Sequence, residues 1–239
     1  MTRLRKRCKM KQGFYTAREL KKLTRRQGFC YDPPIKIART VTIGRDVTIG
    51  MCTVITGNSV LEDGCCLGAG NVLHDVTVKK ECVVRYTVAE NCVFGEKCTV
   101  GPFAQCRNTH LGKECRLGSF VQTKQTSWGD GTKAAHLAYV GDASLGRRVN
   151  VGCGTVFANY DGTRKYFTEV GDDCFLGCNS VLVAPRKIQN GCFVAAGTVL
   201  RRNLPCGTFV LQRVTAECKP NRNYQEKINE EKTNNENGS

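Results

Sequence analysis

The sequence predicts an all-β fold, a parallel β-helix built from hexapeptide repeats and preceded by one short helix. The main observation is a period of six residues between Ile37 and Leu200. Its unbroken part places aliphatic side chains at Ile37, Ile43, Ile49, Ile55, Leu61, Leu67 and Leu73. Six is not a multiple of 3.6, so an amphipathic helix would rotate these residues off one face. A fixed short period of this kind is typical of a β-helix.

The six-residue spacing is interrupted after Leu73, and the same pattern resumes at Val88 along the rest of the chain. Its later members are Val88, Phe94, Val100, Leu111, Leu117, Leu145, Val151, Val170, Leu176, Leu182, Ile188, Val194 and Leu200. Three hexapeptides would make one triangular coil of about 18 residues, and stacked coils would pair their backbones at a spacing of about 4.8 Å. Residues 37–200 therefore predict about nine coils, less any loops.

The chain divides into three sections. Residues 1–31 form a basic arm and a linker helix, in which Thr16 and Glu19 make a capping-box pair and Gly28 lies where a helix would end. Residues 32–218 form the β-helix domain. The polar tail, 219–239, is expected to be disordered.

The formal net charge of +15 is concentrated at one end. Residues 1–29 contain eleven Lys or Arg and one acidic residue. This arm lacks interleaved aromatic residues and any reader motif, so the sequence does not favour a nucleic-acid partner. No apolar segment follows the basic N-terminus, and no stretch reaches the roughly 18 apolar residues of a membrane span. We therefore expect a soluble, cytoplasmic protein.

Many of the 16 cysteines share one position of the repeat. Seven occupy the fifth, small and inward-facing place: Cys65, Cys82, Cys92, Cys98, Cys115, Cys174 and Cys192. We expect these to pack inside as small apolar residues. No C-x-x-C pair occurs, and the three histidines are at least 26 residues apart, so the sequence predicts no metal site.

Interruptions of the repeat are the places to look for chemistry, because loops on a rigid scaffold often carry function. Three stand out: 101–112, 119–143 and 158–173. The last has too many residues for one coil and is expected to project as a loop. His136 lies among small residues, which lets a ligand approach an imidazole suited to act as a general base near neutral pH. The alternative is that His136 is a polar residue with a purely structural role.

Three runs of residues carry a specific resemblance. GPFAQCR, TKQTSWGDGTKAAHLAYVGDASLGRRVNVGCGTVFANYDG and VGDDCFLGCNSVLVAP occur in this order. Together they resemble the acetyltransferase domain of the bifunctional N-acetylglucosamine-1-phosphate uridylyltransferase / glucosamine-1-phosphate N-acetyltransferase family. The similarity extends from about Gly28 to Val214. It implies a left-handed β-helix, a homotrimer with active sites between subunits, and acetyl-CoA as co-substrate with no tightly bound cofactor.

The resemblance also implies roles for individual residues. His136 matches the general base that takes a proton from the sugar's 2-amino group as it attacks the thioester. The positions that match sugar-phosphate contacts are Arg107, Lys124, Tyr139, Asn150 and Lys165. Those that match acetyl-CoA contacts are Cys153, Asn159, Tyr160, Cys178, Ala196 and Arg213.

The chain also departs from the family pattern. Gln105 stands where one of two arginines is usual, and Gln122 stands where a glutamate commonly supports the site. The family's uridylyltransferase domain is absent, so this sequence is either a stand-alone acetyltransferase, with a separate uridylyltransferase as a partner, or part of a longer protein. Two alternatives to glucosamine-1-phosphate acetylation stay open: an acyltransferase with another amino acceptor, and a trimeric scaffold with impaired turnover.

Overall fold

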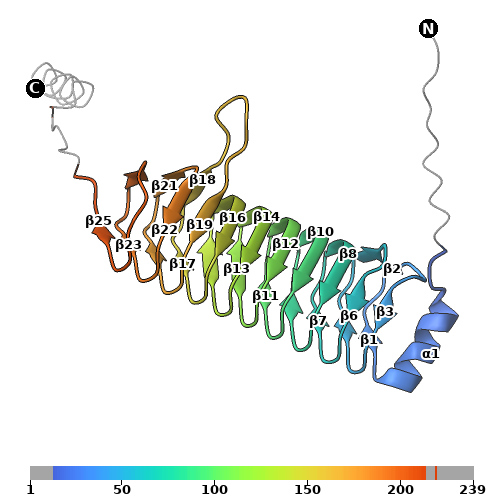
Figure 1. Cartoon of the computed structure of the whole chain (residues 1–239). Helices are drawn as coiled ribbons and strands as arrows, with labels where there is room; N and C mark the ends of the chain where they lie inside the picture. The colour runs from blue at the N-terminus through green and yellow to red at the C-terminus, as the bar shows by residue number, and fades with distance from the viewer. Residues whose placement is uncertain (1–12, 214–218, 220–239) are drawn as a thin grey trace, which may run out of the picture.

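The computed structural model describes residues 13–213 and residue 219, which form a parallel β-solenoid with one helix at its N-terminal end (Figure 1). The expectations for the arm at 1–12 and the tail from 220 fall outside these residues. Helix α1 spans Ala17–Gln27 and confirms the predicted helix. The Thr16 hydroxyl accepts a hydrogen bond from the Glu19 amide, and Gly28 ends the helix with a φ of 69°. Among the described residues, no helix is long and apolar enough to cross a membrane.

The first sheet has 11 strands, one from each successive coil. In spatial order they are β1 (Cys30–Tyr31), β4 (Thr48–Ile49), β7 (Cys66–Leu67), β9 (Val83–Val84), β11 (Thr99–Val100), β13 (Arg116–Ser119), β15 (Lys133–His136), β17 (Asn150–Val151), β20 (Phe175–Leu176), β23 (Phe193–Val194) and β25 (Phe209–Val210). This sheet already begins at Cys30, so the solenoid is longer than the nine coils expected from residues 37–200.

The second sheet has 14 strands and wraps the rest of each coil. Its main path is β2 (Ile35–Ile37), β5 (Thr53–Thr56), β8 (Val72–Val78), β10 (Val88–Phe94), β12 (Gln105–Leu111), β14 (Gln122–Trp128), β16 (Tyr139–Leu145), β18 (Val156–Ala158), β21 (Val181–Val183) and β24 (Val199–Leu200). The strands beside this path are β3 (Thr42–Ile43), β6 (Val60–Leu61), β19 (Thr168–Val170) and β22 (Arg186–Ile188).

Aliphatic columns fill the interior, as the six-residue period predicted. In the first sheet Ile49, Leu67 and Val84 are register partners and are fully buried. One predicted member is wrong: Val88 is 50% exposed, and its neighbour Ala89, the register partner of Leu73, is buried instead. The period slips at this point because β8 and β10 run unbroken around a bend, so their coils are shorter than 18 residues.

Two of the three expected interruptions are regular coils. Residues 105–111, 122–128 and 139–145 form the seven-residue strands β12, β14 and β16, which pair in continuous register. Each strand bends at a residue with positive φ, such as Asn108 at 48° and Gln125 at 50°. Between β1 and β25, the segment from β18 to β19 leaves the solenoid and projects as the predicted loop (Figure 1).

The seven cysteines at the fifth position are all buried and free, which confirms that they pack inside. Backbone hydrogen bonds between coils place four of them in one column: Cys65, Cys82, Cys98 and Cys115. Burial raises the pKa of the Cys65 thiol to about 12 and that of Cys174 to about 11. The Cys65 and Cys174 thiols are therefore protonated at neutral pH and act as packing groups.

Candidate active site

His136 and Tyr139 lie on the two sides of one corner of the solenoid. His136 is the last residue of β15 in the first sheet, and Tyr139 is the first residue of β16 in the second. Leu137 turns the chain between them with a φ of 42°. The imidazole is exposed, and no side chain among residues 13–213 donates to it or accepts from it. Both of its nitrogens are thus free to meet a ligand.

Basic side chains gather on the Tyr139 side of this corner. Arg107 and Lys124 are register partners on β12 and β14, and Gly141 on β16 continues their outward-facing row. Gly141 leaves room that a larger residue would fill. A Cβ atom there would lie 2.5 Å from the Tyr139 hydroxyl and 2.9 Å from the Asn159 amide nitrogen. The missing side chain lets Tyr139 and Asn159 approach the cations.

Lys165 reaches the same place from the projecting loop. Its ammonium group is the main reason that the pKa of Lys124 lies below its ordinary value; burial and Arg107 act in the same direction. Three cations so close together repel one another, and a bound dianion would relieve that repulsion. The structure therefore brings together Arg107, Lys124, Lys165 and Tyr139, four of the five residues expected to contact the sugar phosphate.

Asp142 completes this cluster, and the sequence reasoning missed it. Its carboxylate lies 3.9 Å from the Lys124 ammonium, and it also accepts a hydrogen bond from the Asn159 amide. The side chains of Lys124 and Asp142 are only 16% and 13% exposed. A 17-residue coil spacing would have placed Gly141 beside Lys124, with Asp142 directly after it, but the six-residue count did not reveal that spacing.

Small exposed residues form a row on the His136 side of the corner. The register of β15, β17, β20 and β23 sets His136 level with Cys153, Cys178 and Ala196 on three successive coils. All four residues are exposed. Three coil spacings amount to about 14 Å. The row is therefore an open track that leads from the imidazole toward the C-terminal coils.

The remaining predicted residues lie apart from these two groups. Asn150 faces outward on β17, where its register partners are Lys133 and Phe175. It shares the sheet of His136 and not that of Lys124. The Tyr160 hydroxyl donates to the Gly162 carbonyl inside the projecting loop. Arg213 is exposed beyond β25, and within residues 13–213 no hydrogen bond or ion pair joins it to the track.

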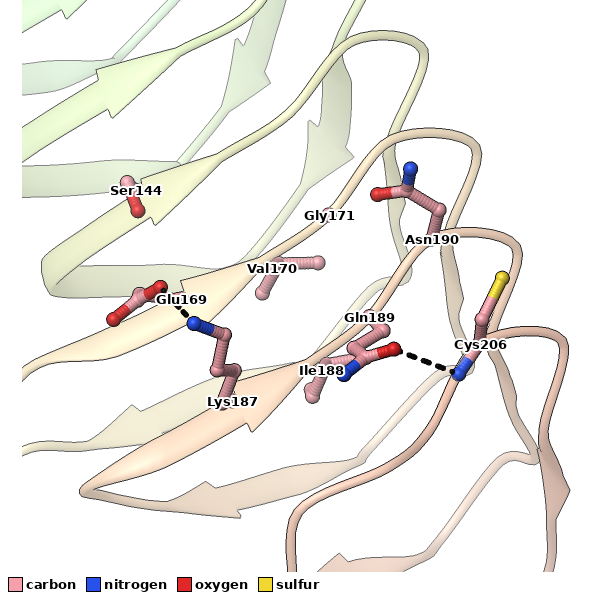
Figure 2. A pocket seen from close by; sticks show the side chains of 9 residues that line it. All are labelled: Ser144, Glu169, Val170, Gly171, Lys187, Ile188, Gln189, Asn190 and Cys206. Carbon is pink, nitrogen blue, oxygen red and sulfur yellow. Dashed lines mark hydrogen bonds and ion pairs between the residues drawn. The ribbon is translucent and has the colours of Figure 1, made fainter.

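A cavity of about 350 Å³ lies elsewhere, around β19 and β22 (Figure 2). Figure 2 shows Lys187 reaching toward Glu169, with 3.4 Å between nitrogen and oxygen, and the Cys206 amide donating to Gln189. Its charges neutralise each other, and none of the predicted site residues lines it. Within residues 13–213, no group of three or more His, Cys, Asp or Glu side chains could hold a metal ion.

Comparison with known protein families shows which family this chain belongs to. The model described as the GMPPB C-terminal domain matches residues 31–160, which is more than half of the sequence. The chain belongs to this family. As a GMPPB C-terminal domain protein it is also homologous to the C-terminal region of the bifunctional protein GlmU, the resemblance that the motifs indicated.

The relatives are considerably longer than this chain. The bifunctional protein GlmU of Exiguobacterium sp. is 42% identical over 191 residues, which cover 79% of this chain and 42% of that protein. GlmU of Clavibacter sepedonicus is 46% identical over 169 residues, with coverage of 70% and 34%. The chain thus spans about two fifths of the length of the relatives it matches. An Arabidopsis UDP-N-acetylglucosamine acyltransferase structure is 16% identical, with a TM-score of 0.47 and coverage of 76% and 68%.

Proposed function

We propose that the chain is an acetyl-CoA-dependent N-acetyltransferase that converts glucosamine-1-phosphate to N-acetylglucosamine-1-phosphate. The observation that carries the proposal is the cluster of Arg107, Lys124 and Lys165 one corner away from the exposed His136 imidazole. A phosphate dianion needs several cationic donors, and its capture would orient the sugar amine. The family relationship to GlmU supports the same assignment.

The reaction follows from these two groups. With the phosphate held by the cations, the 2-amino nitrogen attacks the thioester carbonyl carbon, and a C–N bond forms. The His136 imidazole takes the proton that the amine loses. The tetrahedral intermediate then collapses with cleavage of the C–S bond, and the coenzyme thiolate receives the proton from the imidazolium. The products are the acetamido sugar and CoA, and the proton passes from the amine through His136 to the coenzyme sulfur.

The track beyond His136 would hold acetyl-CoA as a co-substrate. Its exposed, small side chains at Cys153, Cys178 and Ala196 leave space for an extended pantetheine arm. Asn159, Tyr160 and Arg213 remain proposed coenzyme contacts, and Asn150 a proposed acceptor contact. The Asn159 amide is already engaged by Asp142, so its contribution to the coenzyme would come through its remaining carbonyl oxygen or its backbone.

We also propose that the protein is a cytoplasmic homotrimer with its sites between subunits. An exposed apolar ladder supports a subunit contact beside His136: Tyr86, Phe103, Phe120 and Leu137 occupy the same corner of successive coils and are 48–61% exposed. The described cysteines are all free, which agrees with a reducing compartment.

Release of free CoA with glucosamine-1-phosphate as acceptor tests the function. We expect turnover by the native chain and a loss of about 10²- to 10⁴-fold in kcat for His136→Ala. His110→Ala is the matched control, because His110 is exposed on β12 and lies outside the cluster. Absence of CoA release, or full activity of His136→Ala, would contradict the proposal. Equal use of glucosamine without its phosphate would instead favour another acceptor.

A further inference from the structure

We propose that Asp142 is a positioning residue that joins the acceptor side of the site to the coenzyme side by holding Lys124 and Asn159 together. The inference rests on the proposed function, since it concerns the same two substrates. One oxygen makes both contacts: Oδ2 lies 3.9 Å from the Lys124 ammonium and accepts the hydrogen bond from the Asn159 amide. A single carboxylate thus connects a strand of the solenoid to the base of the projecting loop.

The burial of this ion pair sets it apart from the others on the surface. The side chains of Lys124 and Asp142 are 16% and 13% exposed, whereas those of Lys97 and Glu81 are 59% and 64% exposed. Water and salt screen the attraction between exposed charges, and they screen a mostly buried pair much less. The Asp142 carboxylate therefore has more influence on the position and charge of Lys124 than a surface partner would have.

Asp142 also counteracts repulsion among the cations. Lys165 from the loop and Arg107 from β12 both face Lys124 and favour loss of its proton. Asp142 on β16 favours the protonated ammonium form. The carboxylate thus opposes the effect of the two neighbouring cations on the Lys124 proton.

The same carboxylate anchors the loop that carries Lys165. Asn159 is the first residue after β18, and its carbonyl accepts a 2.8 Å hydrogen bond from the Tyr166 amide near the other end of the loop. Asn159 itself is only 7% exposed. Fixing its amide therefore fixes both ends of the loop, and with them the approach of Lys165.

The backbone at this corner allows clean substitutions. Asp142 has a φ of 47°, in the left-handed region that Asn and Gly tolerate. Asn108 and Asn91 occupy the equivalent bend two and three coils earlier, with φ of 48° and 51°. Asp142→Asn removes the charge and keeps a carbonyl oxygen for Asn159. Asp142→Gly removes both contacts without straining the backbone.

Steady-state kinetics of the full chain separate the two contacts. For Asp142→Asn we expect KM for glucosamine-1-phosphate to rise about tenfold, with KM for acetyl-CoA close to the native value. As pH rises, acceptor binding should also begin to weaken at a lower pH than in the native chain, because Lys124 loses its proton more readily without the Asp142 charge. Asp142→Gly should raise both KM values and speed amide hydrogen exchange in residues 159–167. Asp75→Asn and Asp75→Gly, at the same bend of β8, are the controls. They should change neither the two KM values nor the hydrogen exchange of residues 159–167.

Native KM values and native loop exchange in both Asp142 variants would overturn the inference, as would equal changes in the Asp75 variants. Loop exchange also separates this inference from the proposed function. If the native chain releases no CoA, the function fails, but faster loop exchange in Asp142→Gly and not in Asp75→Gly would still support the positioning role. Unchanged exchange would refute it.

Discussion

The side chains around Tyr139 fit together because residue 141 has no side chain. The three atoms nearest to an added Cβ all lie at the ends of side chains: the Tyr139 hydroxyl with its Cζ carbon, and the Asn159 amide nitrogen. At Gly152, by contrast, an added Cβ would lie 2.6 Å from the backbone nitrogen of Cys178 on the next coil. The two glycines therefore serve different ends, one making room for a site and the other letting coils stack.

Gly141→Ala should reduce activity more than stability. Tyr139 can rotate away at little cost, so we expect the free energy of unfolding to fall by less than about 1 kcal/mol, while KM for the acceptor rises several-fold. Gly152→Ala, which forces two backbones apart, should cost about 1–3 kcal/mol. Urea denaturation and CoA-release kinetics of both variants test this contrast. A large loss of stability with native KM in Gly141→Ala would contradict it.

At the scale of the strand, the bends explain where the sequence reasoning went wrong. β10, β12, β14 and β16 continue around a bend at a residue with positive φ, so a coil closes with 17 residues between Val88, Gln105, Gln122 and Tyr139. The six-residue count assumed three equal segments per coil. It therefore placed Val88 inside and interpreted regular strands as interruptions.

The buried Cys65 thiol should make stability depend on pH in the alkaline range. An unfolded thiol loses its proton near pH 8.5, whereas burial raises the pKa of Cys65 to about 12. The folded state thus binds a proton that the unfolded state has lost, and the contribution of this thiol to stability decreases as pH rises from about 8.5 toward 12.

We expect the free energy of unfolding to fall less steeply between pH 8 and 10.5 in Cys65→Ala than in the native chain. Urea denaturation across this range measures the slope. Cys30→Ala, at an exposed position, is the control and should retain the native slope. Identical slopes for Cys65→Ala and the native chain would show that Cys65 titrates alike in the folded and unfolded states.

At the scale of the whole molecule, the solenoid exposes an apolar ladder beside its proposed catalytic corner. The rings of Phe103 and Phe120 are stacked with centroids 5.5 Å apart, and the Phe120 side chain is 61% exposed. Large exposed aromatic groups in a row are typical of surfaces that another protein covers. A second copy of this chain is the occupant that the proposed trimer supplies.

Phe120→Glu should therefore weaken the trimer. A charge in a desolvated contact is costly, so we expect the mass in solution to fall from three times the 26.4 kDa chain toward the monomer. Met51→Glu, at a half-exposed position near the N-terminal end, is the control. Sedimentation equilibrium measures the masses. A monomeric native protein, or a trimeric Phe120→Glu variant, would contradict the assignment of this ladder to the subunit contact.

The sequence by itself determined the repeating architecture, the capped helix and the buried cysteines, and it supplied most members of the proposed site. These properties depend on local patterns, because each coil repeats the same inward-facing positions and the helix is bounded by its own caps. Only the tertiary structure decided which residues of different coils become neighbours. The number of residues in each coil sets that alignment, so Asp142 meets Lys124 from the preceding coil and Asn159 from the following one.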